Sequence, residues 1–199
     1  MKCVVLDAMG VLYNAHDDVA EFLYPFILEK DGLNDLNRIK GIYIEASLGK
    51  MTSADFWKRM GLDPMVEDEY LSRHAITSGL IAFLEEMKVQ GVELWCLSND
   101  VSEWSGKLRR KFKIESYFKG FIISGDVGLR KPDPAIYELL IGRLKCKAND
   151  ILFVDDNIRN LDAAERKGIG TVLFDSSGRV VNTKHGEVVN FKELGELIR

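Results

Sequence analysis

Five short runs of apolar, β-branched and aromatic residues punctuate the chain and predict β-strands. They lie at residues 2–6, 92–97, 121–124, 151–154 and 171–174. Most of these runs are apolar at consecutive positions, which is typical of strands that helices cover on both faces. Because helical patterns separate the last four runs, the sequence predicts a parallel α/β sheet with right-handed crossovers.

Local signals indicate where several helices begin and end. Asp100 is suited to cap a helix after the second run, and Asn190 is suited to cap the last helix. Asp133 and Pro134 combine a capping side chain with a proline at the first helical position. A helix that follows the fourth run is expected to stop at Gly168.

A long stretch without a convincing strand separates the first run from the second. Residues 17–30 carry apolar side chains at helical spacing, and residues 52–55 (Thr-Ser-Ala-Asp) resemble a capping box. The sequence therefore predicts two parts. Residues 1–14 and 79–199 form an α/β core, and residues 15–78 form a small helical insert.

Composition and charge mainly exclude certain partners and targeting segments. The formal net charge of the 199 residues is −4, so neither nucleic acid nor an anionic membrane is expected as a partner. No apolar run approaches the roughly 18 residues of a membrane span, and Asp7 interrupts the N-terminal apolar stretch, which argues against a signal peptide. Three cysteines without paired spacing predict free thiols and a cytoplasmic protein. No feature marks a dimer interface.

Polar residues follow four of the predicted strands where each strand ends. In chain order they are Asp7, Ser98 with Asn99, Gly128 with Lys131, and Asp155 with Asp156. Ligands of parallel sheets bind outside the carboxyl ends of the strands, so these groups are expected to converge. The set suits phosphoryl transfer, because a carboxylate can attack phosphorus and carboxylate oxygens suit Mg²⁺. Ser98 and Lys131 are suited to hold phosphate oxygens.

The same residues resemble the four sequence motifs of the haloacid dehalogenase superfamily. The motifs are Asp7-Ala8-Met9-Gly10-Val11-Leu12, Ser98-Asn99, Lys131-Pro132-Asp133-Pro134, and Asp155-Asp156 with Asn160 and Asp162. The resemblance implies a Rossmann-like three-layer sandwich with a parallel five-stranded sheet and a helical cap at residues 15–78. Residues 97–174 are most similar to the branch of small sugar-phosphate phosphatases and the amino-terminal domain of soluble epoxide hydrolases.

The resemblance also implies a role for each motif residue in the hydrolysis of a small phosphorylated substrate with Mg²⁺. Asp7 is the nucleophile, and Lys131 orients it. Ser98 binds the phosphoryl group, and Asn99 and Gly10 shape the pocket. The metal ligands are Asp7, the backbone oxygen of Met9, Asp155 and Asp156. The turn at residues 48–51 precedes the capping box, near where similar caps contact substrate. Lys50 is therefore a further substrate-binding candidate.

Met9 departs from the pattern of the family's phosphatases. They carry a second aspartate at this position, which protonates the leaving oxygen and later activates water. A thioether can do neither. Side chains that follow soon after Met9, or a cap residue, are candidate replacements; the former are Asn14, His16, Asp17 and Asp18.

Three alternatives to the phosphatase interpretation stay open. Haloacid dehalogenases lack the second aspartate and need no metal, and Asn99 and Tyr137 are compatible with them, whereas the acid pair Asp155–Asp156 argues against them. Phosphonate hydrolases keep magnesium and use a cap lysine, for which Lys50 or Lys58 is a candidate. A pseudoenzyme that binds phosphate without turnover is the third alternative.

Overall fold

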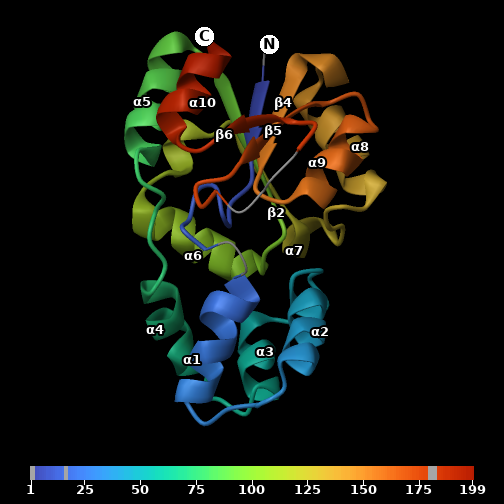
Figure 1. Cartoon of the computed structure of the whole chain (residues 1–199). Helices are drawn as coiled ribbons and strands as arrows, with labels where there is room; N and C mark the ends of the chain where they lie inside the picture. Colours follow the sequence, from blue (N-terminus) through green and yellow to red (C-terminus); the bar gives the residue numbers. More distant parts are fainter. Residues whose placement is uncertain (1–2, 16–17, 179–182) are drawn as a thin grey trace.

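Six parallel strands form one sheet in the order β3-β2-β1-β4-β5-β6 (Figure 1). The computed structural model describes residues 3–15, 18–178 and 183–199. The strands are β1 (Cys3–Leu6), β2 (Glu93–Ser98), β3 (Gly120–Ile123), β4 (Ile151–Asp155), β5 (Gly170–Phe174) and β6 (Gly186–Val188). The α/β class and the parallel sheet predicted from the sequence are confirmed.

The predicted count of five strands is wrong, because the sequence signal missed β6. This edge strand pairs with β5 over three residues, and Val188 alone of the three is buried. A strand with a single buried side chain produces neither an apolar run nor an alternating pattern. The five strands that were predicted agree with the structure to within a residue or two at each end.

Helices cover both faces of the sheet. One face packs against α5 (Leu80–Gln90), α6 (Ser102–Phe112) and α10 (Phe191–Ile198), and the other against α8 (Pro134–Leu144) and α9 (Ile158–Glu165) (Figure 1). Side chains of β1 alternate between these layers, so Val4 and Leu6 belong to the apolar cluster of α5, and Val5 to that of α8 and α9. This alternation explains why consecutive apolar residues are needed in the central strand.

The capping predictions are confirmed at three of four helices. The side chains of Thr52 and Asp133 accept hydrogen bonds from backbone N–H groups at the starts of α3 and α8, and Asn190 does the same for α10. Asp100 does not cap α6, because the cap position is Val101. Instead Asp100 is fully buried and accepts a 2.7 Å hydrogen bond from the N–H of Val101.

A group of helices between β1 and α5 lies beyond the carboxyl edge of the sheet (Figure 1). Its members are η1 (Asp18–Leu23), α1 (Tyr24–Glu29), α2 (Leu36–Ala46), α3 (Ser53–Arg59), η2 (Pro64–Val66) and α4 (Glu67–Ser72). The remaining short elements, all in the core, are η3 (Glu115–Tyr117), α7 (Ser124–Val127) and η4 (Ala148–Asp150). We call the first group the cap helices. Their extent follows the predicted insert at residues 15–78, and the division into core and cap stays a prediction.

The chain enters and leaves the cap helices through a hydrogen-bonded neck. Tyr13 and Ile76 form an antiparallel bridge. On either side, the N–H of Asn14 donates to the oxygen of Ala75 (3.0 Å), and the N–H of Thr77 donates to the oxygen of Leu12 (2.9 Å). Because these bonds join the two crossing segments, both are fixed at one place beside the sheet.

Helix α6 also holds the cap helices through a buried carboxylate. Glu67 accepts hydrogen bonds from the indole N–H groups of Trp57 (3.0 Å) and Trp104 (2.8 Å), and Lys107 lies 2.8 Å from its other oxygen. Lys111 donates 2.9 Å bonds to three backbone oxygens at the end of α4, those of Leu71, Ser72 and His74. These contacts join α3 and α4 to a core helix.

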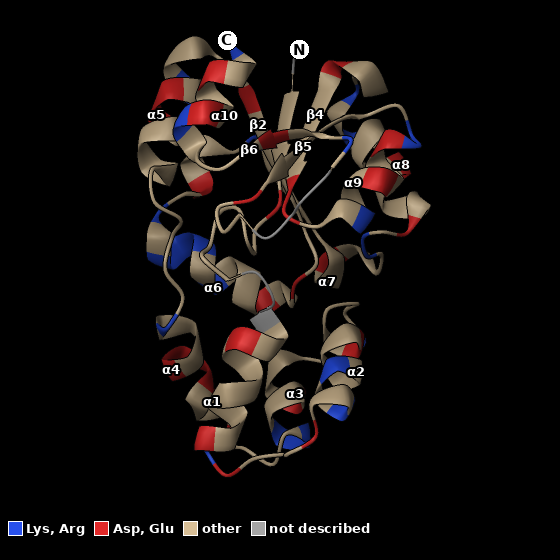
Figure 2. Ribbon diagram, viewed as in Figure 1, with Lys and Arg blue, Asp and Glu red and all other residues tan. Residues whose placement is uncertain are grey.

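Charges of both signs are spread over the helices, and basic residues gather along α6 (Figure 2). Over the residues that the structure describes, no helix has the length and apolar character needed to cross a bilayer.

Candidate active site

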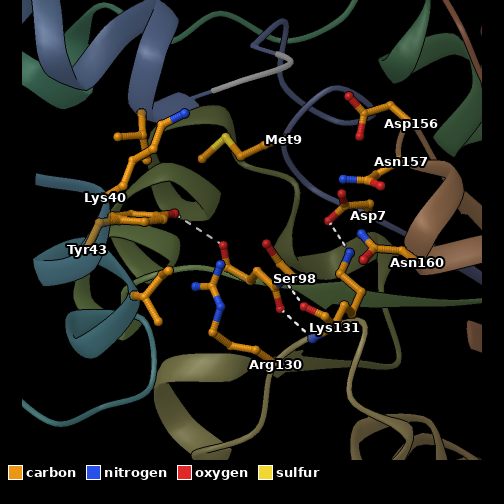
Figure 3. Close-up of a pocket in the computed structure, with 13 residues that line it drawn as sticks. Asp7, Met9, Lys40, Tyr43, Ser98, Arg130, Lys131, Asp156, Asn157 and Asn160 are labelled. Atoms are coloured by element: carbon orange, nitrogen blue, oxygen red, sulfur yellow. Dashed lines mark hydrogen bonds and ion pairs between the residues drawn. The ribbon is translucent and has the colours of Figure 1, made fainter. Parts of the chain in front are cut away.

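A cavity of about 370 Å³ lies between the carboxyl edge of the sheet and helix α2 (Figure 3). Its volume falls within the range of small-molecule sites. The residues predicted from the motifs that line it are Asp7, Met9, Ser98, Asn99, Lys131, Asp156 and Asn160. Asp155 is fully buried and contacts Lys131. The structure thus brings the predicted strand-end residues together, and their chemical roles stay predictions.

Lys131 bridges two carboxylates from neighbouring strands. Its Nζ lies 2.7 Å from Oδ1 of Asp7, after β1, and 2.7 Å from Oδ2 of Asp155, at the end of β4. Burial alone would lower the pKa of Lys131, but Asp155 and Asp7 raise it above its ordinary value. Lys131 is therefore a permanent cation that fixes the orientation of Asp7.

Three carboxylates meet beside this lysine. Oxygens of Asp7, Asp155 and Asp156 all lie within 4.8 Å of one another. Burial and the charge of Asp155 raise the pKa of Asp7 well above its ordinary value, and Asp156 adds to this, while Lys131 opposes it. Gly10 allows this arrangement, because its φ is +79° and a Cβ there would stand 2.1 Å from Oδ2 of Asp156. An all-oxygen cluster of three carboxylates is a donor set that suits Mg²⁺.

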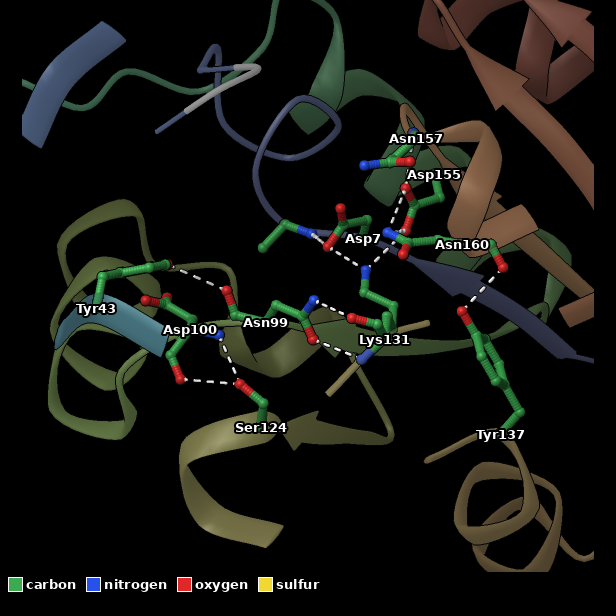
Figure 4. Close-up of polar contacts among 11 residues, drawn as sticks. Asp7, Tyr43, Asn99, Asp100, Ser124, Lys131, Tyr137, Asp155, Asn157 and Asn160 are labelled. Atoms are coloured by element: carbon green, nitrogen blue, oxygen red, sulfur yellow. Dashed lines mark hydrogen bonds and ion pairs between the residues drawn. The ribbon is translucent and has the colours of Figure 1, made fainter. Parts of the chain in front are cut away.

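Asp155 is held by groups from the start of α9 (Figure 4). The N–H of Asn157 donates to Oδ1 (2.8 Å), and Nδ2 of Asn160 lies 3.1 and 3.0 Å from its two oxygens. The hydroxyl of Tyr137 donates in turn to the oxygen of Asn160 (2.8 Å). Asn160, from the fourth motif, thus holds Asp155 in the cluster, and Tyr137 in turn holds Asn160.

Ser98 presents a hydroxyl that has no hydrogen-bond partner among the described residues. Its side chain is fully buried and lines the cavity, and Oγ makes no hydrogen bond with any residue that the structure describes. Buried hydroxyls are normally paired. A ligand oxygen in the cavity would provide the missing partner.

Asn99 acts through its side chain as well as its backbone. Its amide exchanges two 2.8 Å hydrogen bonds with the backbone of Lys131. Its backbone oxygen accepts a 3.2 Å bond from the hydroxyl of Tyr43, which belongs to α2 (Figure 4). Asn99 therefore links the lysine loop to a cap helix.

Several cavity residues were not predicted from the sequence. Helix α2 contributes Lys40, Tyr43 and Ile44, and the core loops contribute Arg130 and Asn157. Nothing in the spacing of residues 40–44 distinguishes a wall of a site from any other turn of an amphipathic helix. Arg130 could have been noticed, because it adjoins Lys131.

Lys50 does not line this cavity. It is exposed, and with Gly49 and Met51 it lines a separate depression that also includes Ser102 and Gly125 of the core. The structure thus does not bring Lys50 together with the other predicted site residues. Among the described residues of the cap helices, the lysine that lines the cavity is Lys40.

Met9 is half-buried in the cavity wall, where it can offer no proton. Of the candidate replacements, Asn14 is exposed beside the neck, and His16, Asp17 and the side chain of Asp18 lie outside the described residues. Among the described residues that line the cavity, the carboxylates are those of Asp7 and Asp156.

A model of the haloacid dehalogenase-like hydrolase family matches residues 1–168. The chain belongs to this family. The motif residues, the parallel sheet and the helices inserted after β1 agree with that membership, so the chain is a hydrolase.

Relatives of this hydrolase include both phosphatases and a dehalogenase. It is 26% identical to a sesquiterpene phosphatase of Aspergillus oryzae, over 88% of this chain and 91% of the relative. It is 24% identical to (S)-2-haloacid dehalogenase 4A of Burkholderia cepacia, over 89% and 84% of the two chains. A phosphoglycolate phosphatase of Yersinia pestis is 30% identical to it over a shorter stretch, which covers 54% of this chain and 48% of the relative.

Solved structures share the fold of the hydrolase at low identity. An enzyme of this family from Bacteroides thetaiotaomicron, in complex with magnesium and inorganic phosphate, is 22% identical with a TM-score of 0.76, over 90% of this chain and 96% of that chain. A phosphatase from Thermococcus onnurineus is 21% identical with a TM-score of 0.76, over 100% and 98%. At these identities the likeness establishes the fold.

Proposed function

We propose that this hydrolase cleaves small phosphomonoesters in a Mg²⁺-dependent reaction, through an aspartyl phosphate on Asp7. The observation that carries the proposal is the cluster of Asp7, Asp155 and Asp156 around Lys131, with the Ser98 hydroxyl facing the same cavity. The relatives named as phosphatases support it. Residues 15–78 would act as the cap that selects the substrate.

Asp7, Asp155 and Asp156 would hold the metal, together with the backbone oxygen of Met9. Mg²⁺ prefers oxygen ligands and usually keeps several waters, which suits a cluster of three carboxylates of which two, Asp7 and Asp156, line the cavity. When bound, the ion neutralises charge on the phosphate oxygens. The solved Bacteroides enzyme, in complex with magnesium and inorganic phosphate, supports this assignment.

In the first half-reaction a carboxylate oxygen of Asp7 attacks phosphorus, and the bond from phosphorus to the alcohol oxygen breaks. Oδ1 of Asp7 is occupied by Lys131 (2.7 Å) and by the N–H of Ala8 (2.7 Å), so Oδ2 is the attacking atom. The Ser98 hydroxyl would donate to a phosphoryl oxygen. The departing alkoxide then takes up a proton.

In the second half-reaction a water molecule attacks the phosphorus of the aspartyl phosphate. Inorganic phosphate leaves, the carboxylate of Asp7 re-forms, and one water has been consumed for each alcohol and phosphate released. Both halves need a proton transfer that Met9 cannot perform. Solvent or another side chain would therefore have to supply it, and turnover is expected to be slow.

The test is phosphate release from a panel of phosphomonoesters, with Mg²⁺ and with chelator, for the wild type and Asp7→Asn. Release that requires metal and disappears in Asp7→Asn is the expected result, because an amide cannot form the intermediate. Magnesium binding, measured by calorimetry, gives a readout that is independent of turnover. Equal rates for the two proteins would overturn the assignment of Asp7.

Metal-independent dehalogenation is the second candidate function. The observation that favours it is Met9 in the cavity wall, because halide leaves without a proton, and the Burkholderia cepacia relative supports it. Asp156 and Asp155 oppose it, since three carboxylates repel a carboxylate substrate when no metal is bound. Chloride release from (S)-2-chloropropionate in chelator would favour it over phosphate transfer. Phosphate binding without either turnover would favour a pseudoenzyme.

A further inference from the structure

Arg130 is a cation in the cavity wall whose close contacts are all neutral. Its Nη1 donates to the hydroxyl of Ser47, and its Cζ lies 5.7 Å from the centre of the Tyr43 ring. Within the described part of the chain, no carboxylate oxygen comes within 4.0 Å of its guanidinium. Asp100 and Asp7 attract it from a greater distance.

Burial makes this lack of a counterion costly. Water no longer covers most of the Arg130 guanidinium, and this burial lowers the pKa of Arg130. A desolvated guanidinium is normally paired with a carboxylate or a phosphate, because its five N–H donors otherwise lose their hydrogen bonds. Ser47 satisfies one of the five. The remaining donors have no anionic partner among the described residues, and the cavity is the space beside them.

The position of Arg130 separates it from the reacting centre. In Figure 3, Arg130 and Tyr43 lie on one side of Ser98, and Asp7 and Lys131 lie on the other. A phosphoryl group bound at Ser98 and Asp7 would therefore leave the far end of the substrate beside Arg130. Lys40, which also lines the cavity, adds positive charge to the Arg130 side.

We propose that Arg130 binds a second anionic group, so that the hydrolase selects phosphomonoesters that carry a carboxylate or a further phosphate beyond the ester oxygen. The inference rests on the proposed phosphatase function for the position of the first phosphate. A guanidinium suits either anion, because its paired N–H groups match two oxygens.

Two matched ligands isolate the second anion. Glycerol 3-phosphate and 3-phosphoglycerate have the same phosphate and carbon chain, and differ in a hydroxymethyl group against a carboxylate. Calorimetric titration of both into Asp7→Asn protein with Mg²⁺ compares their binding without turnover. We expect the carboxylate ligand to bind roughly 10- to 100-fold more tightly, as for a charge-assisted hydrogen-bonded pair. Glycerol 1,3-bisphosphate distinguishes a second phosphate from a carboxylate.

Arg130→Met in the same background should bring the ratio of the two affinities close to one, because it weakens binding of the carboxylate ligand far more than binding of glycerol 3-phosphate. Ser47→Ala removes the Arg130 hydrogen bond to the cap but keeps the cation, so it should preserve the preference. Arg38→Met removes an exposed charge from α2 and should also preserve it. If Arg130→Met does not fold, Arg130→Lys, which keeps the charge but loses the paired N–H groups, should retain only part of the preference.

Equal binding of glycerol 3-phosphate and both anionic ligands to the parent protein, or a preference that survives in Arg130→Met, would overturn the inference. A preference that depends on Arg130, in a hydrolase that releases no phosphate from any ester, would support the inference and contradict the proposed function. Failure of the two proposals is thus distinguishable.

Discussion

At the scale of the single residue, Met9 leaves the site without a proton donor at position 9. It lines the cavity two positions after Asp7, where a carboxylate would be able to reach the leaving oxygen. Met9→Asp should therefore raise phosphatase turnover. General acid–base catalysis contributes about 10²–10⁴-fold when its geometry is right, and a gain of about tenfold or more is expected in an unadapted site.

The measurement is phosphate release at saturating Mg²⁺, with Asp7→Asn/Met9→Asp as the inactive control. An unchanged or lower rate in the single variant would mean that proton transfer does not limit the reaction. The dehalogenase alternative makes the opposite prediction, because a carboxylate at position 9 would repel a halocarboxylate.

Gly10 decides how close Asp156 can come. Gly10→Ala would place a Cβ 2.1 Å from Oδ2 of Asp156, at a φ of +79° that side chains rarely adopt. We expect weaker Mg²⁺ binding, seen by calorimetry, and a higher Mg²⁺ concentration for half-maximal activity. Gly142→Ala is the matched control, because a Cβ there meets no atom within 4 Å in helix α8. Equal Mg²⁺ affinity in the two variants would contradict the assignment of Asp156 as a metal ligand.

The strand-end residues of the site could be predicted from the sequence, whereas the cavity residues that lie between α2 and the core could not. Asp7, Ser98 and Lys131 follow strands of one parallel sheet, so the topology alone brings them together. Tyr43 and Arg130 meet across the boundary between α2 and a core loop. Such a contact depends on how the two parts dock, which no local pattern encodes.

At the scale of the element, strands buried on both faces could be predicted and exposed ones could not. The run of β4 is buried at all five positions, whereas β6 is exposed at two of three. The misplaced cap of α6 has a related cause. Asp100 is a residue type that often caps helices, but it is fully buried beyond the end of β2, where its N–H donates to the hydroxyl of Ser124.

Glu67 joins three helices, so replacing it should lower the free energy of unfolding. It is buried and accepts bonds from both Trp57 and Trp104. Glu67→Gln should lower the free energy of unfolding by about 1–3 kcal/mol, the usual range for a hydrogen bond to a charged group. Urea unfolding followed by tryptophan fluorescence measures it. Asp68→Asn is the control, because Asp68 contacts the same Lys107 but is 83% exposed, and it should change stability by less than about 0.5 kcal/mol.

The stabilising effect of Glu67 should also depend on pH. Burial opposes ionisation of Glu67, yet Lys107 and the hydrogen bonds to the carboxylate prevail and hold its pKa below the ordinary 4.5. Its contribution is therefore present above about pH 4.5 and disappears as the pH falls through the folded-state pKa. The stability gap between wild type and Glu67→Gln should narrow below that pH. A constant gap would show that the charge is not what stabilises the contact.

At the scale of the whole molecule, the cap helices meet the core closely, and we expect catalysis by the hydrolase to depend on this contact. Gly49, in the turn after α2, approaches α7 so closely that a Cβ would stand 2.3 Å from the backbone oxygen of Gly125. Gly49→Ala should push this turn away and move Tyr43 out of the cavity wall. We expect a fall of several-fold in kcat/KM for the best phosphomonoester.

Gly61→Ala controls for backbone strain alone. Its φ of +78° matches the +70° of Gly49, but its Cβ would meet no atom within 4 Å. Gly61→Ala should therefore lose about 1 kcal/mol of stability in thermal unfolding from strain alone, and Gly49→Ala should lose more because of its contact with Gly125. A similar fall in kcat/KM for both would mean that the turn does not position the cavity wall.

The neck at Tyr13 and Ile76 has a consequence for inheritance. Backbone hydrogen bonds close the base of the insert, and they form between N–H and C=O groups whatever side chains the residues carry. The closure entropy of a long loop grows only slowly with length, by about 0.6 kcal/mol for each doubling. Lineages could therefore exchange, lengthen or shorten what lies beyond the neck while the catalytic sheet is passed on unaltered. One ancestral reaction could in this way be supplied with new substrates.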